Sequence, residues 1–129
     1  MHRQTRFALI LLAVFTLAAC SDQASDSSSV GQVLDTISAE TSQGAELART
    51  KCVSCHNLTQ SRRKIGPGLK GIYGKKPSIT GVPFEVWDET ALDHWLAGPT
   101  DVKPGTPMAI PGLKDEKERK AIISYLKQI

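Results

Sequence analysis

The sequence predicts a small all-α domain with three main helices and short turns. Two observations favour this class: three segments carry helix caps or apolar residues at helical spacing, and no segment shows a convincing strand alternation. The chain has 129 residues, which is typical of one domain. Its net charge of +3 is too small to indicate nucleic-acid binding.

A third observation concerns the pentapeptide Cys52-Val53-Ser54-Cys55-His56. Two thiols lie about one helical turn apart, and an imidazole follows directly. The pattern is typical of covalent haem attachment, in which each thiol adds to a vinyl group and the histidine binds the iron. One haem c would also serve as the centre of a core that so short a domain could hardly build alone.

The pentapeptide allows three other interpretations. A zinc site needs four ligands, and His94 is the only other histidine outside the N-terminal leader. A thioredoxin-like site needs a βαβ context, which the sequence does not show. The third alternative is a plain small disulfide.

Taken in order, residues 1–19 read as a lipoprotein signal peptide. Arg3 and Arg6 precede an apolar stretch over residues 7–19 that is too short to span a bilayer comfortably. The stretch ends in Leu17-Ala18-Ala19-Cys20, which resembles a bacterial lipobox, so Cys20 is the expected lipidation site. The alternative is an ordinary signal peptide that is cleaved near residue 19 and leaves Cys20 as a free thiol. Both interpretations place the domain outside the cytoplasm.

Residues 20–41 are rich in Ser, Asp, Gln and Ala, and we expect them to form a lipid-anchored flexible tether. The folded domain is expected over residues 42–129. The alternative for the tether is a short amphipathic helix. Its apolar face would consist of Val30, Val33, Leu34 and Ile37.

The first helix of the domain is expected from about Ser42 into the pentapeptide, with Thr41 or Ser42 as N-cap. Gly44 and Ala48 are small residues on one face, which would allow another helix to approach closely. We expect that neighbour to be the last helix, crossing the first nearly perpendicularly.

A second helix is expected after Trp87, with Asp88 as N-cap and Gly98 and Pro99 at its end. The last helix is expected from Asp115. Its apolar stripe consists of Ile122, Tyr125, Leu126 and Ile129.

The irregular segments contain further candidate residues. Arg62, Arg63 and Lys64 lie in a polar segment that reads as a surface loop. Met108 lies in a loop over residues 100–113, and apart from Met1 it is the only methionine. A methionine in such a place can also be a gap-filling core residue. His94 falls off the apolar stripe of its helix and is expected to be exposed.

With these segments in place, residues 42–129 resemble a class I cytochrome c. Five motifs carry the resemblance, in chain order: the pentapeptide, Gly66-Pro67-Gly68-Leu69, Trp87 with Glu89 and Leu92, Pro104-Gly105-Thr106-Pro107-Met108, and residues 121–126. It implies a small cytochrome c fold around one covalent haem, with its N- and C-terminal helices crossing.

The resemblance also implies the roles of individual residues. Cys52 and Cys55 would form the thioethers, and His56 and Met108 would be the proximal and distal iron ligands. The Pro67 carbonyl would accept a hydrogen bond from the proximal histidine, and Trp87 would contact a haem propionate. The sequence departs from the family at two positions expected beside the haem or its ligands. Lys75 stands where mitochondrial cytochromes c have an arginine, and Trp95 stands where a tyrosine often lies near the methionine sulfur.

With two axial ligands the iron has no open position, so the resemblance implies a mono-haem one-electron carrier in a respiratory or periplasmic chain rather than an enzyme. Three alternatives remain: a cytochrome subunit that accepts electrons from a specific periplasmic dehydrogenase, a haem sensor or enzyme with an open site if Met108 is not bound, and a thiol–disulfide enzyme without haem. The expected location is the bacterial cell envelope, lipid-anchored and facing the periplasm or exterior.

Electrons would pass at a haem edge that the family leaves exposed. Residues 42–129 contain 14 Lys and Arg against 9 Asp and Glu, a net charge of +5. In the family fold, the rim of that edge would include Lys51, Arg62, Arg63, Lys64 and Lys114. These cations are expected to dock acidic patches on a redox donor and acceptor. The alternative is a generic solvated surface.

Overall fold

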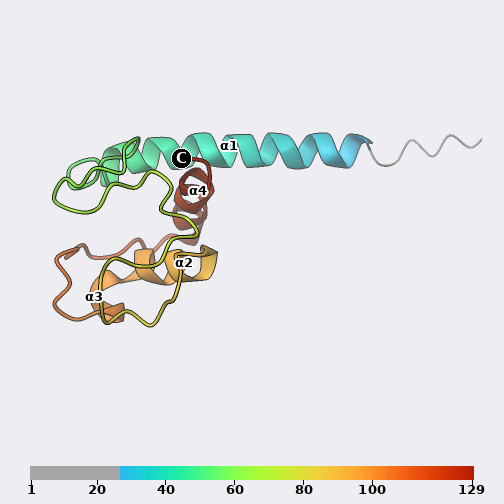
Figure 1. Ribbon diagram of the computed structural model, residues 1–129. Helices are drawn as coiled ribbons and strands as arrows, with labels where there is room; N and C mark the ends of the chain where they lie inside the picture. Colours follow the sequence, from blue (N-terminus) through green and yellow to red (C-terminus); the bar gives the residue numbers. More distant parts are fainter. Residues whose placement is uncertain (1–26) are drawn as a thin grey trace, which may run out of the picture.

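The computed structural model describes residues 27–129, and these form a helical domain (Figure 1). In chain order the helices are α1 (Ser27–Lys51), α2 (Glu89–Ala97), α3 (Pro99–Val102) and α4 (Glu116–Leu126). No strand occurs between residues 27 and 129, so the all-α prediction is confirmed. The expected signal peptide and Cys20 lie outside the described residues.

The N-terminal part of α1 differs from the prediction. Residues 27–41 were expected to be flexible and the helix to begin near Ser42, but α1 is continuous from Ser27. The Ser42 hydroxyl donates to the Ser38 carbonyl inside the helix instead of capping it. The physical reason is cooperative: once the packed end has formed, each further residue adds a hydrogen bond without a new nucleation cost. No proline interrupts the segment.

The first and last helices cross, as expected. In Figure 1, α1 runs across the view, whereas α4 is seen nearly along its axis beneath it. Ala48 and Ala121 are completely buried at the crossing. A Cβ atom on Gly44 would collide with the backbone carbonyl of Ala121 and would also press on Cβ of Tyr125. The glycine is therefore what lets the two backbones approach so closely.

Polar contacts extend this crossing in both directions along α1. The Ser124 hydroxyl donates to Glu40 at 3.1 Å, and the Gln128 amide donates to the Thr41 hydroxyl at 2.8 Å. At the other end, Lys51 forms an ion pair of 3.3 Å with Glu118. This ion pair ties the end of α1 to the first turn of α4.

The core lies between α2 and α4. Asp88 caps α2 as predicted, since its carboxylate accepts from the Ala91 amide at 2.8 Å. Asp115 caps α4 in the same way, accepting from the Lys117 amide. The buried cluster joins both helices and consists of Trp87, Ala91, Leu92, Trp95, Leu96, Ile122, Ile123 and Leu126. Ile123, which the sequence analysis did not assign to the core, is 1% exposed.

The crossing of α1 and α4 can be tested with two matched glycine substitutions. Gly44→Ala should lower the free energy of unfolding by about 1–3 kcal/mol, because the added methyl overpacks the contact with Ala121. Gly31→Ala places a methyl on the same helix with no neighbouring atom within 4 Å. It should be neutral or stabilise by up to about 1 kcal/mol, since alanine is the better helix former. Denaturant titration of both variants gives the comparison, and equal changes would contradict the crossing.

Candidate haem-binding site

The pentapeptide continues from the end of α1 as a tight turn. The amides of Cys55 and His56 both donate to the Cys52 carbonyl, at 3.1 and 2.9 Å. Both thiols therefore lie within one turn, and neither forms a disulfide. Burial raises the pKa of the Cys52 thiol, and the charge of Lys51 only partly opposes this. Thiol–disulfide enzymes need a lowered cysteine pKa, so this environment does not suit that alternative.

A zinc site also finds no support in the described part of the chain. Between residues 27 and 129, no group of three or more His, Cys, Asp or Glu side chains could hold a metal ion. Cys52, Cys55 and His56 thus lack further protein ligands of the kind that a structural zinc site requires.

The His56 imidazole is fixed in one orientation and one tautomer. Its Nδ1 lies 2.7 Å from the Pro67 carbonyl oxygen. Since that oxygen can only accept, Nδ1 must carry the proton, and Nε2 keeps a lone pair for a metal. Gly66 lies against the ring, and a Cβ there would collide with it. The turn that contains Gly66 and Pro67 is therefore shaped around the imidazole.

The Met108 sulfur is held by an indole. Trp95 Nε1 donates to Met108 Sδ at 3.1 Å, and Trp95 itself is buried at 7% exposure. The Met108 amide donates to the hydroxyl of Thr106 at 3.3 Å, and Thr106 is almost completely buried. A thioether sulfur has two lone pairs, so the indole occupies one side and leaves the other for a metal. Sequence reasoning had not assigned this supporting role to Thr106, although it belongs to the Pro-Gly-Thr-x-Met segment.

The structure brings Trp87 and Lys75 together. The Gly74 amide donates to the Trp87 carbonyl at 3.0 Å, and the Trp87 amide donates to the Lys75 carbonyl at 2.8 Å. Trp87 is buried and its ring centre lies 5.5 Å from that of Trp95, whereas Lys75 is exposed. Trp87 and Lys75, the two residues considered for contact with a haem propionate, are thus joined by a backbone hydrogen bond.

The five candidate docking cations fall into two groups. Lys51 directly precedes the pentapeptide, Lys64 donates to the Val53 carbonyl at 2.7 Å, and Arg62 and Arg63 are exposed beside it in the chain. Lys114 instead donates to the Ala97 carbonyl at 3.2 Å, at the end of α2. No contact joins Lys114 to the other four among the described residues.

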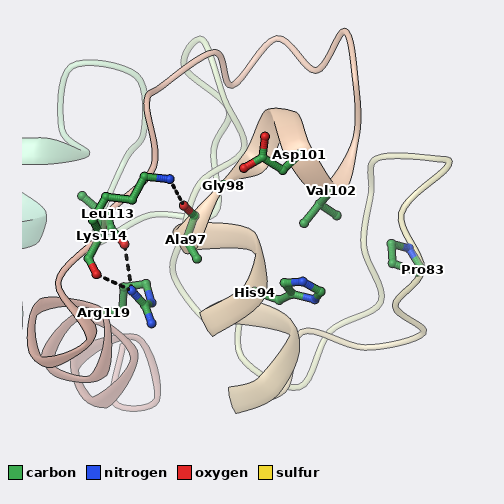
Figure 2. Close-up of a pocket in the computed structure, with 9 residues that line it drawn as sticks. All are labelled: Pro83, His94, Ala97, Gly98, Asp101, Val102, Leu113, Lys114 and Arg119. Atoms are coloured by element: carbon green, nitrogen blue, oxygen red, sulfur yellow. Dashed lines mark hydrogen bonds between the residues drawn. The ribbon is translucent and has the colours of Figure 1, made fainter.

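Figure 2 shows a hollow of about 500 Å³ that is separate from the candidate haem residues. Its lining residues are Pro83, His94, Ala97, Gly98, Asp101, Val102, Leu113, Lys114 and Arg119. None of Cys52, Cys55, His56 and Met108 is among them. His94 is exposed here, as predicted.

Arg119 in this hollow has a structural role that the sequence did not reveal. It pairs with Asp93 at 2.7 Å and donates to the carbonyls of Leu113 and Lys114 at 2.9 and 3.1 Å. The hydrogen bond with Asp93 raises the pKa of Arg119 further. The guanidinium thereby pins the end of the Met108 loop to α2 and α4. In the sequence, Arg119 is one of several charged residues between 114 and 120, and nothing distinguishes it from them.

The donor set fits a haem c. It combines two unpaired thiols on one turn, an oriented neutral imidazole and a thioether sulfur, and the last two are the axial pair of many c-type cytochromes. Apolar side chains that pack only partly against the core include Leu69, Ile72 and Tyr125, and Tyr125 lines a second hollow together with His56. Such half-covered apolar residues are what a large flat ring would cover.

Comparison with known proteins gives a consistent result. The cytochrome c family model matches residues 41–129. Cytochrome c2 iso-2 of Magnetospirillum molischianum is 38% identical over 89 residues, which cover 62% of this chain and 92% of that protein. Cytochrome c of Theileria parva is 35% identical over 98 residues, covering 69% and 85%.

Among solved structures, cytochrome cH from Methylobacterium extorquens superposes with a TM-score of 0.57 at 33% identity, covering 67% of this chain and 96% of that one. The matched region contains the pentapeptide, the Pro67 turn and the Met108 loop. This chain therefore belongs to the cytochrome c family, whose members carry one covalent haem c with its iron and transfer electrons instead of catalysing a reaction.

Proposed function

We propose that this cytochrome is a membrane-tethered one-electron carrier of the bacterial cell envelope, with His56 and Met108 as the two iron ligands and Cys52 and Cys55 as the thioether residues. The observation that carries the proposal is the fixed His56 ring, with Nδ1 bonded to Pro67 and Nε2 left for iron. The hydrogen bond from the Trp95 indole to the Met108 sulfur supports Met108 as the second ligand.

When bound, the haem iron supplies the one-electron couple. The protein's part is to set the strength and position of both ligands. The Pro67 carbonyl accepts from His56 and so increases the donor strength of Nε2. The Trp95 N–H withdraws electron density from the Met108 sulfur, which weakens it as a donor and favours the reduced metal. The indole N–H can only donate a hydrogen bond, so a water molecule cannot donate a hydrogen bond to it on that side of the sulfur.

These contacts favour a carrier over a haem sensor with an open site. Opening the distal position would require Met108 to leave a sulfur hydrogen bond and a backbone hydrogen bond to Thr106. Its loop is also pinned at its far end by Arg119. Ligands held in this way need to move little when the electron arrives or leaves.

Replacing the distal ligand tests this assignment. Met108→Ala should lower the reduction potential and abolish the weak far-red band of sulfur-to-iron charge transfer, because water or another weak ligand takes the position. Added carbon monoxide should bind the reduced variant but not the parent protein. Visible spectroscopy and redox titration give both readouts.

The covalent attachment provides an internal control for this variant. A haem stain on a denaturing gel should remain positive, since Cys52 and Cys55 are unchanged. An unaltered spectrum and potential in Met108→Ala would remove Met108 from the metal site.

The membrane tether is proposed from the lipobox-like Leu17-Ala18-Ala19-Cys20. A lipid on Cys20 is the proposed attachment. No helix within residues 27–129 is long and apolar enough to cross a membrane. Cys20→Ser should move the haem-staining protein out of the membrane fraction or block its processing. The parent protein washed with high salt is the control for peripheral binding. A fully processed Cys20→Ser protein that remains on salt-washed membranes would contradict lipidation.

We also propose a basic docking face beside the pentapeptide for acidic patches on the redox donor and acceptor. The structure guides the choice of residues: Lys51 is paired with Glu118, so reversing its charge would also disturb the helix crossing. Arg62 and Arg63 are exposed and suit a cleaner test. Their positive charge would steer an acidic partner and raise the association rate at low salt.

The docking face predicts a salt-dependent loss of rate. Arg62→Glu together with Arg63→Glu should slow electron transfer to the natural partner, and the difference from the parent should shrink as salt shortens the Debye length towards about 8 Å. Stopped-flow mixing measures this. Lys76→Glu with Lys103→Glu makes the same change in net charge at two lysines outside the proposed docking face and serves as the control. Equal slowing in both double variants would indicate a general charge effect and no docking face.

A further inference from the structure

The N-terminal part of α1 presents an apolar stripe outside the region that matches the cytochrome c family. The stripe consists of Val30, Val33, Leu34 and Ile37, whose exposed fractions are 55%, 57%, 59% and 46%. Their spacing places them on one face of the helix. The family match begins at residue 41, so holding the haem does not account for these residues.

The stripe lies on the same side of α1 as the rest of the domain. Val30 and Ala48 are 18 residues apart, which is about five helical turns, and so they point in the same direction. Ala48 and Gly44 contact α4 on that side. In Figure 1 the N-terminal part of α1 projects past α4. The stripe thus faces the angle between this projecting part and the rest of the domain.

This geometry decides between two kinds of occupant. A bilayer is broad and flat, and it would meet the domain before it covered the stripe. Residues 27–41 also carry Asp35 and Glu40 and no Lys or Arg, whereas helices that lie on membranes usually have a basic polar face. A narrow occupant such as another helix fits the angle.

We propose that a second copy of this chain covers the stripe, with the two α1 helices antiparallel about a two-fold axis between Val33 and Leu34. In this register Val30 faces Ile37 of the second copy, and Val33 faces Leu34 of the second copy. The contact is self-complementary, as a two-fold interface requires. Each projecting helix then lies in the angle beside the other copy's domain.

Charge supports this arrangement. The projecting helix is acidic and residues 42–129 carry a net charge of +5, so each helix meets a domain of opposite sign. Asp35 points away from the contact.

The contact is small, so the dimer is weak. Four half-exposed apolar residues on each copy bury less than the roughly 1,200 Å² of a standard stable interface. Confinement of both copies on one surface would raise their effective concentration and favour pairing. The proposal goes beyond the electron-carrier function and does not depend on the iron ligands.

Single-cysteine cross-linking tests the proposal in the full haem-loaded chain, in membranes of the cells that produce it. Val33→Cys puts a thiol next to the two-fold axis, and mild oxidation should give a disulfide-linked dimer of this chain. Asp35→Cys is the matched control, because it lies at nearly the same height on the far side of α1. It should give no dimer beyond that of the parent. Adding Ile37→Asp to Val33→Cys should abolish the cross-link.

Each other outcome overturns the proposal. A Val33→Cys variant that forms no dimer, or no more than Asp35→Cys, excludes the antiparallel pair. A cross-link to a different protein assigns the stripe to a hetero-partner. Protection of the Val33→Cys thiol from a water-soluble reagent without dimer formation assigns it to lipid. An unchanged haem spectrum in all variants shows that the domain is folded, since the substituted positions are exposed.

Discussion

The close approach of α1 and α4 is the constraint on which the rest of the structure depends. At Gly44 the two backbones are so near that no side chain fits between them. Because α1 leads directly into the pentapeptide, this contact fixes the positions of both cysteines and of His56. Because α4 supplies Ile122, Ile123 and Leu126 to the core, it also fixes α2 and hence Trp95. The candidate iron ligands His56 and Met108 are far apart in the chain, and the crossing of α1 and α4 sets how they lie relative to each other.

The Met108 side of the site depends on a second set of contacts. Trp95 is held in the core by α2, so the sulfur that it binds takes its position from a packed helix. Arg119 on α4 then fixes the far end of the loop through two carbonyls. Ordering an irregular loop costs conformational entropy. Here the hydrogen bonds from the Trp95 indole and the Arg119 guanidinium help to offset that cost.

The sequence was most informative where a residue acts locally. The caps at Asp88 and Asp115 depend on neighbours within three positions, and the structure has the predicted cap at both. The pentapeptide and Gly66-Pro67-Gly68-Leu69 were recognisable because each is a short run of consecutive residues. Sequence reasoning was least informative where a residue acts across elements. Nothing local marks Arg119 as the anchor of a loop, or Glu118 as the partner of Lys51.

The start of α1 was missed for a different reason. Residues 27–41 have a polar composition that is typical of a tether, and their propensity alone would not form a helix in isolation. Their helical state depends on the packed end of the same helix and on the contacts of Glu40 with Ser124 in α4 and of Thr41 with Gln128 just after α4. The helical spacing of Val30, Val33, Leu34 and Ile37 was the one indication of a helix in this segment.

A rigid α1 changes how a tethered carrier would reach its partners. With 25 residues, α1 is about 37 Å long, and its C-terminal end leads into the haem-attachment turn. A lipid on Cys20 would then hold the domain through a rod that begins at Ser27. The crossing with α4 fixes the domain on this rod, so α1 and the domain turn together. Docking then depends on orientation at the surface as well as on charge. An antiparallel pair would restrict it further, since two domains at opposite ends of the paired helices would present their basic faces in directions related by a two-fold axis.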